Sequence, residues 1–170
     1  MIHELCITDD VVSLRPLVHE DIEMLRVWRN EDGIRHCFVD NNLITPDQQA
    51  QWFERYKTDV TDFMFISEYK NEPVGVSALY NLDFNNKVCE FGRLMLGNIH
   101  LRGLGLGKRI TFLTTRLGFE SLGLRRIYLE VFKDNVSAKR IYEALGYCLI
   151  YEVVKNGRSC CLMEIIKKDV

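Results

Sequence analysis

Residues 96–108 read Leu96-Gly97-Asn98-Ile99-His100-Leu101-Arg102-Gly103-Leu104-Gly105-Leu106-Gly107-Lys108, and this stretch decides the fold. The pattern is typical of a strand that ends, a loop almost without side chains, and a helix that begins. Glycine has no Cβ, so the backbone there can approach a ligand closely, and the first N–H groups of a helix have no partner within it. Because the helix N-terminus also carries partial positive charge, the stretch predicts a turn that binds a phosphate or pyrophosphate group.

The spacing of the glycines excludes two common phosphate sites. A nucleoside-triphosphate P-loop needs a glycine five positions before the Gly-Lys pair and a Ser or Thr after it, but those places hold Arg102 and Arg109. The dinucleotide fingerprint G-x-G-x-x-G follows the first strand of a βαβ unit. Here Gly103, Gly105 and Gly107 alternate strictly and lie beyond the middle of the chain, so this site is excluded as well.

The pattern that fits is Arg-x-x-Gly-x-Gly, at Arg102, Gly105 and Gly107. It resembles the coenzyme A pyrophosphate loop of the GNAT superfamily of N-acetyltransferases. About thirty residues later, residues 134–147 are similar to the second GNAT signature, with matching positions at Asn135, Ala138, Tyr142, Gly146 and Tyr147. Residues 14–21 resemble the start of the ribosomal-protein and polyamine branch of the superfamily. The similarity covers essentially the whole chain.

Composition limits the remaining possibilities. The chain has 170 residues, 47% of them hydrophobic, which predicts one domain over residues 1–170 with a sizeable core. With 22 basic and 24 acidic side chains there is no overall field that would draw the protein onto nucleic acid. The N-terminus lacks a signal-peptide pattern and no apolar run is long enough to span a membrane, so we expect a cytoplasmic protein with no membrane partner.

The cysteines predict no metal site. Six are present and none forms a C-x-x-C pair or lies at metal-ligand spacing from a histidine, so we interpret them as reduced core thiols. They are Cys6, Cys37, Cys89, Cys148, Cys160 and Cys161. The sequence does not exclude a homodimer.

Periodicity and turn residues predict a mixed α/β (α+β) fold in which a central, mostly antiparallel sheet of about seven strands carries four helices. The strands are expected at residues 5–15, 63–69, 74–84, 87–96, 126–131, 147–154 and 158–167, the first with a bend at Asp9-Asp10. One helix should follow Pro16, with a stripe of Val18, Ile22 and Leu25, and the others should start at Thr45-Pro46, Lys108 and Ser137. Residues 30–44 should form a loop or short helix near the substrate.

The GNAT resemblance implies that the strands at 87–96 and 126–131 splay apart, and that the pantetheine arm of acetyl-CoA lies between them. The backbone of the first strand would pair with the arm, and the glycine loop would hold the pyrophosphate. The implied coenzyme-binding residues are Leu94, Met95, Leu96, Arg102, Gly103, Leu104, Gly105, Leu106, Gly107, Lys108 and Asn135. A plain glycine-rich turn is the alternative for the loop, and a helix cap is an equal and compatible role for Asn135.

Two residues carry the predicted chemistry. Tyr142 matches the tyrosine that lies near the coenzyme sulfur in many relatives, where a phenol can protonate the departing thiolate; its alternative is a core aromatic. Glu90 lies where many relatives place a carboxylate that takes the amine proton through water. Its alternative is a surface salt bridge, such as one to Arg93, and strand alternation does not say which face of the strand meets the cleft. His36 and His100 are alternative bases.

The resemblance implies transfer of an acetyl group from acetyl-CoA to a primary amine by direct attack, with neither metal nor covalent enzyme intermediate. A small-molecule acceptor is expected. Four segments are similar to enzymes that acetylate a nucleotide-linked amino sugar: Trp28-Arg29-Asn30, Ile34-Arg35, Gln51-Trp52-Phe53 and residues 90–95. Arginines among the acidic loops suit a phosphate-bearing acceptor. A ribosomal-protein N-terminus and spermidine or another polyamine remain open as acceptors. A non-catalytic acyl-CoA-binding module is the alternative from another class.

Overall fold

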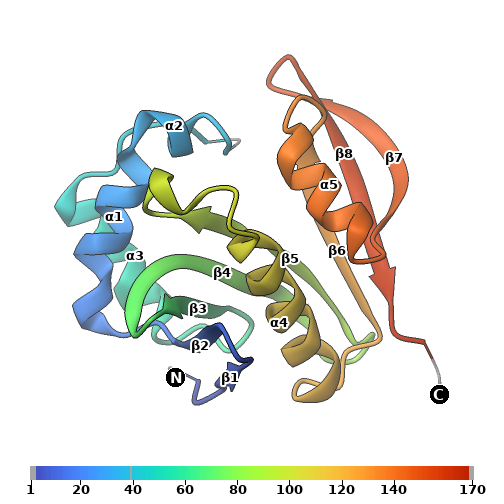
Figure 1. Cartoon of the computed structure of the whole chain (residues 1–170), viewed down its shortest axis with the longest axis horizontal. Helices are drawn as coiled ribbons and strands as arrows, with labels where there is room; N and C mark the ends of the chain where they lie inside the picture. Colours follow the sequence, from blue (N-terminus) through green and yellow to red (C-terminus); the bar gives the residue numbers. More distant parts are fainter. Residues whose placement is uncertain (1–2, 39, 169–170) are drawn as a thin grey trace.

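The structure is a computed structural model that describes residues 3–38 and 40–168. Within these residues one sheet of eight strands runs in the order β1-β2-β3-β4-β5-β6-β8-β7, and only β5 and β6 pair in parallel (Figure 1). The strands are β1 Ile7–Thr8, β2 Val12–Pro16, β3 Phe63–Tyr69, β4 Glu72–Asp83, β5 Val88–Leu96, β6 Arg126–Phe132, β7 Cys148–Lys155 and β8 Arg158–Ile166. The helices are α1 Ile22–Asn30, α2 Asp32–Arg35, α3 Pro46–Tyr56, α4 Leu106–Glu120 and α5 Val136–Ala144.

The predicted fold class is confirmed, with one more strand and one more helix than expected among the described residues. The first predicted strand is divided in two because the Asp9 carboxylate accepts hydrogen bonds from the N–H groups of Val11 and Val12, both at 2.7 Å, which closes a turn. The additional helix is α2, a single turn inside residues 30–44. The α-helix expected from Val18 onward begins at Ile22, after a 3-10 helix at His19–Asp21, and Val18 is 36% exposed.

Local signals set several boundaries as predicted. Helix α3 starts at Pro46, as expected, because Thr45 and Gln48 form a capping box: the Thr45 hydroxyl accepts from the Gln48 N–H at 3.2 Å, and the Gln48 carboxamide oxygen accepts from the Thr45 N–H at 2.9 Å. Asn156 and Gly157 join β7 to β8 with positive φ angles of 49° and 75°, as a tight hairpin turn requires.

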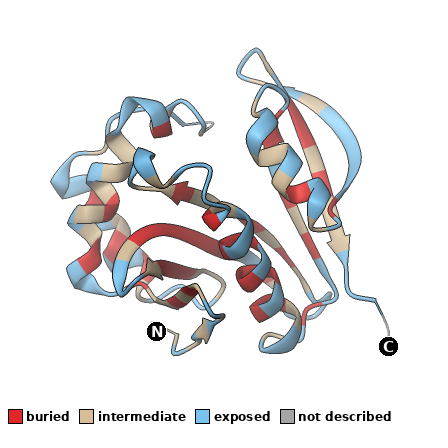
Figure 2. Ribbon diagram, in the orientation of Figure 1, coloured by how far each residue is buried: buried red, intermediate tan, exposed pale blue. Residues whose placement is uncertain are grey.

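The sheet has an apolar core on each face, and many residues of its central strands are buried (Figure 2). On one face α4 packs against β1, β2, β4 and β5, and the buried side chains there include Leu79, Phe91 and Leu113. On the other face α1 and α3 contact each other, and Phe53, Met64 and Val76 belong to a second cluster. Among the described residues no helix is long and apolar enough to cross a membrane.

Strands β5 and β6 part after a short parallel ladder. They pair only from Val88 to Glu90 against Arg126 to Tyr128, after which β6 continues alongside β8 and the facing edge of β5 has no strand partner among the described residues. Figure 1 shows the two strands separating, so the predicted splay is confirmed.

A bulge in β5 alters the predicted side-chain alternation. The pairing register between β4 and β5 shifts here, and Arg93 has a φ of 53°. Leu94 therefore packs with Cys89 and Phe91 against the α4-side core, although strict alternation along the strand would put it on the face of Glu90. Met95 joins the cluster on the α1 and α3 side.

The expectation that all the cysteines are core thiols is also wrong. Cys89, Cys160 and Cys161 are buried, whereas Cys6, Cys37 and Cys148 are exposed. Cys148 is exposed because β7 is an edge strand, and the other two lie before β1 and after α2. Within the described residues, no group of three or more His, Cys, Asp or Glu side chains gathers as a metal site would.

Candidate active site

At the start of α4 the glycine loop places backbone N–H groups that have no hydrogen-bond partner in the described part of the chain. Gly105, with a φ of 76°, precedes the helix, whose first hydrogen bond runs from the Arg109 N–H to the Gly105 oxygen at 3.2 Å. Within the described residues the N–H groups of residues 105–108 donate to no other group. A Cβ at Gly103 or Gly105 would meet nothing within 4 Å, so open space lies in front of these donors. The arrangement suits an anion such as a pyrophosphate.

The side chains of the loop contribute unequally. Leu106 is buried and Leu104 is exposed, so both would offer a ligand only backbone. Lys108 is exposed, and the Arg102 guanidinium donates to the backbone oxygen of Gly33 at 3.4 Å. Arg109 forms a salt bridge with Asp9 at 2.9 Å and is thereby turned away from binding an anion at the loop.

The unpaired edge of β5 is the second element that could hold a coenzyme. Leu94, Met95 and Leu96 lie on the part of β5 beyond its ladder with β6, so their backbone groups face the gap. Met95 is 6% exposed, and the other two are half-buried. An extended pantetheine arm with its own amides matches such an edge, since each amide can pair with a strand backbone.

Asn135 is the N-cap of α5. Its side-chain oxygen accepts a hydrogen bond from the Ala138 N–H at 3.3 Å, so the predicted capping role is confirmed. Its role beside the coenzyme stays a prediction.

Tyr142 lies on α5 and is buried, with its ring 5.9 Å from that of Phe91 and 5.8 Å from that of Tyr147. The Tyr147 hydroxyl pairs with the Thr115 hydroxyl at 2.8 Å, whereas the Tyr142 hydroxyl has no hydrogen-bond partner among the described residues. Burial raises the pKa of Tyr142 well above its ordinary value, with a smaller contribution from Cys37. The side chain is thus both a core aromatic and a protonated, unpaired hydroxyl.

Glu90 lies at the last paired position before β5 and β6 separate. Its carboxylate accepts hydrogen bonds from the Tyr80 hydroxyl at 2.7 Å and from the Asn81 side chain at 3.0 Å. Burial and then this carboxylate raise the pKa of Tyr80. The expected alternative, a salt bridge to Arg93, is wrong, because Arg93 binds Asp62 at 2.7 Å instead.

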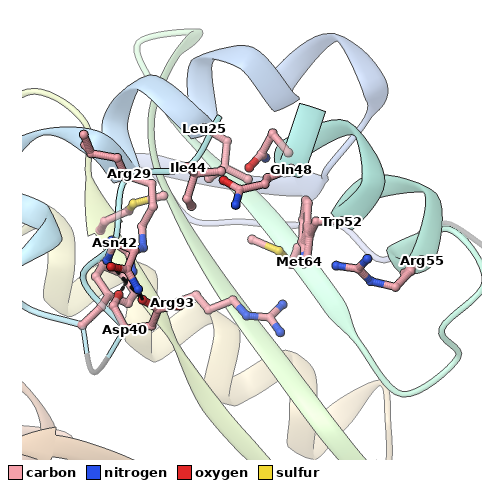
Figure 3. A pocket seen from close by; sticks show the side chains of 14 residues that line it. Leu25, Arg29, Asp40, Asn42, Ile44, Gln48, Trp52, Arg55, Met64 and Arg93 are labelled. Atoms are coloured by element: carbon pink, nitrogen blue, oxygen red, sulfur yellow. Dashed lines mark hydrogen bonds between the residues drawn. The ribbon is translucent and has the colours of Figure 1, made fainter. Parts of the chain in front are cut away.

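A cavity of about 580 Å³ opens on the α1 and α3 side of the sheet (Figure 3). Its walls come from α1, the loop after α2, α3, β3 and β5, and its polar lining comprises Arg29, Asp40, Asn42, Gln48, Gln49, Arg55 and Arg93. Leu25, Trp52, Met64 and Met95 supply apolar surface. Glu90, Tyr142, His36 and His100 are not among the lining residues.

Sequence reasoning missed three of these polar residues, all on α3: Gln48, Gln49 and Arg55. Gln49 shares the buried face of α3 with Phe53 and Tyr56, at i, i+4 and i+7. A carboxamide at a core-facing helix position was the signal that could have identified it.

A family model described as an acetyltransferase (GNAT) domain matches residues 12–147. The chain belongs to the GNAT acetyltransferases. It is an acetyl-CoA-dependent N-acetyltransferase, so the prediction of an enzyme is confirmed over that of a non-catalytic binding module. Its acetyl donor is acetyl-CoA, and the loop, the α4 N-terminus and the free β5 edge fit that molecule.

Three curated relatives of this GNAT protein differ in their printed activities. It is 26% identical over 151 residues to spermidine N(1)-acetyltransferase of Escherichia coli K12, covering 86% of this chain and 80% of the relative. It is 31% identical over 150 residues to a probable spermine N(1)-acetyltransferase of Bacillus subtilis subsp. natto, covering 79% and 94%. Acetyltransferase PseH of Campylobacter jejuni 81-176 is 25% identical over 145 residues, with 85% and 87% covered.

The fold of the GNAT protein is shared by spermidine N-acetyltransferase from Vibrio cholerae in complex with CoA and spermine. The two superpose with a TM-score of 0.86 over 93% of this chain and 96% of the other, at 19% sequence identity. Aminoglycoside acetyltransferase AAC(6')-Ib in complex with coenzyme A has a TM-score of 0.78 at 21% identity over 92% and 95% of the two chains. At these identities the likeness establishes the fold alone.

Proposed function

We propose that this N-acetyltransferase acts on the amine of a small acceptor that also bears anionic oxygens, such as a nucleotide-linked amino sugar. The observation that carries the proposal is the charge of the cavity, which is lined by Arg29, Arg55 and Arg93 but by one carboxylate, Asp40. Arg93 is neutralised by Asp62, whereas Arg29 and Arg55 form no salt bridge with another described residue. Guanidinium groups that outnumber the carboxylates lining a cavity favour a phosphate or a similar anion.

A polyamine is the second candidate, favoured by the printed activities of the spermidine and spermine acetyltransferase relatives. A site for a polyamine would need several carboxylates, because each ammonium that leaves water must be paired. Asp40 alone supplies one, and its carboxylate already accepts two hydrogen bonds from Asn42, at 2.8 and 3.1 Å. We therefore place the polyamine second.

When bound, acetyl-CoA supplies a thioester that a free amine can attack. We propose that the N–H groups of residues 105–108, with Arg102 and Lys108, hold its pyrophosphate, and that the β5 edge at residues 94–96 and Asn135 hold its pantetheine arm. Tyr142 is proposed to protonate the leaving sulfur, and its hydroxyl, which is unpaired within the described residues and stays protonated because burial raises its pKa, supports that role. Glu90 is proposed to receive the amine proton through water. It lies three residues before the bulge at Arg93, a distance of roughly 10 Å along a strand.

Steady-state kinetics at saturating acetyl-CoA test the acceptor. The panel comprises UDP-glucosamine, free glucosamine, spermidine and a peptide with a free N-terminus, with release of the CoA thiol as the readout. We expect UDP-glucosamine to have the highest kcat/KM and to lose at least about 10-fold in Arg55→Gln, since one charge-assisted hydrogen bond is worth about 1.5–3 kcal/mol. A kcat/KM for spermidine or the peptide well above both sugars would refute the proposal.

A further inference from the structure

The acceptor cavity contains two buried hydrogen-bond donors that have no partner. Gln49 on α3 is 5% exposed and lines the cavity, and its amide nitrogen is buried without a hydrogen bond to any described residue. Leaving such a group unpaired costs about 1–3 kcal/mol. The same helix face otherwise buries Phe53 and Tyr56. A carboxamide kept there at this cost points to a ligand that accepts its missing hydrogen bond.

Arg29 on α1 presents the second unpaired donor. One terminal nitrogen of its guanidinium donates to the backbone oxygen of Asp40, and the group lies 3.9 Å from the ring centroid of Phe38. The other terminal nitrogen, Nη1, is buried and has no partner among the described residues. These contacts hold the guanidinium rigidly while leaving one N–H edge unused. Helices α1 and α3 contact each other, and both residues line the same cavity.

The two buried unpaired atoms are both donors, and that limits what can satisfy them. An amide NH₂ and a guanidinium have no acceptor capacity at nitrogen, so each needs an oxygen or another acceptor from the ligand. A protonated polyamine offers only N–H and C–H groups and would leave both unpaired. A sugar hydroxyl, a carbonyl or a phosphate oxygen would pair them.

We infer that the unpaired N–H groups of Gln49 and Arg29 form an oxygen subsite, which binds an oxygen atom of the acceptor and so determines which amines this enzyme accepts. The inference deepens the proposed function and rests on its assignment of this cavity to the acceptor. It requires an oxygen acceptor in the substrate but no nucleotide. An acceptor that carries oxygen near its amine is selected, and a bare alkyl polyamine is selected against because the two donors stay unpaired.

Substitutions at Gln49 test this with matched controls. Gln49→Met keeps the length of the side chain and removes the amide, and Gln49→Glu keeps the shape while replacing the donor with an anion. Arg29→Lys keeps the charge but removes the planar fork. Gln51→Met and Gln51→Glu make the same changes on the exposed side of α3, outside the cavity lining. For all variants the melting temperature and the KM for acetyl-CoA report whether the fold and the donor site are intact.

We expect Gln49→Met, Gln49→Glu and Arg29→Lys to lower kcat/KM for UDP-glucosamine or free glucosamine by about 10- to 100-fold, as loss of a hydrogen bond in a desolvated site predicts. Spermidine turnover should stay the same in Gln49→Met and rise in Gln49→Glu, and the Gln51 variants should match the parent. Two results would overturn the oxygen subsite. One is an unchanged kcat/KM for both sugars in Gln49→Met. The other is a kcat/KM that falls in Gln49→Met but rises in Gln49→Glu for the same acceptor.

The two proposals fail in different ways. If free glucosamine is used as well as UDP-glucosamine and both depend on Gln49, the nucleotide-linked acceptor is wrong and the oxygen subsite stands. If UDP-glucosamine is preferred but Gln49→Met turns it over like the parent, the proposed function stands and the subsite is wrong. If spermidine is the best acceptor and Gln49→Met does not affect it, both are wrong.

Discussion

Replacing Gly105 by alanine separates coenzyme recognition from backbone strain. Gly105 has a φ of 76° and directly precedes α4, and a Cβ there would meet no protein atom within 4 Å. Gly123, beyond the other end of α4, is a matched control, because its φ is 64° and its surroundings are equally open. Both alanine variants suffer the same left-handed backbone strain, but only one changes the space before the helix N-terminus.

The expected magnitudes follow from these two effects. A residue with a Cβ in the left-handed region costs roughly 1–2 kcal/mol, which for a chain of this size lowers Tm by about 2–8 °C. We expect that decrease in both variants. In Gly105→Ala the Cβ also obstructs the approach of a pyrophosphate to the N–H groups of residues 105–108. Loss of one charge-assisted hydrogen bond, about 1.5–3 kcal/mol, weakens CoA binding by roughly 10- to 100-fold.

Isothermal titration with CoA, alongside thermal unfolding of each variant without ligand, measures the two effects separately. Gly123→Ala should bind CoA like the parent. Equal CoA affinity in Gly105→Ala and Gly123→Ala, at equal loss of Tm, would refute the assignment of this loop to the pyrophosphate. Gly107→Val is a poorer probe because a Cβ at Gly107 would lie 3.3 Å from Ile141, which disturbs packing between α4 and α5 directly.

Three further predictions concern β5 and its neighbours. Tyr142→Phe should lower kcat by about 100-fold at unchanged CoA affinity, and an unchanged kcat would show that Tyr142 is only a core aromatic. Because burial raises the pKa of Tyr142, the parent should show no alkaline loss of kcat from this group below about pH 10. Glu90→Gln should lower kcat by about 100-fold without raising the KM for acetyl-CoA. A lower Tm at the parent's kcat would show instead that the carboxylate serves to position Tyr80 by its hydrogen bond. Gly97→Ala should destabilise the fold by at least about 2 kcal/mol in denaturant unfolding, because its Cβ would lie 2.0 Å from the Trp28 ring; a parent-like midpoint would show that this ring moves freely.

Much of the fold could be predicted from short patterns because their physics is local. The Thr45 and Gln48 capping box, the Asn156-Gly157 hairpin and the glycine loop before α4 each depend on a few adjacent residues with defined φ angles and hydrogen bonds. Strand β3 begins and ends where alternation predicted, at Phe63 and Tyr69. These signals, with the two GNAT signatures, were enough for the fold class and the reaction class.

What the sequence by itself determined, therefore, is the scaffold and the glycine loop before α4, and only the tertiary structure decided the lining of the cavity. The partner of Arg93 is Asp62, 31 residues away, and no local pattern distinguishes it from Glu90. The bulge at Arg93 reverses which side chains share a face, and the unpaired nitrogens of Gln49 and Arg29 become visible only when α1 and α3 are packed together. A hydrogen-bond partner brought together by folding depends on three-dimensional distance, which spacing along the chain does not contain.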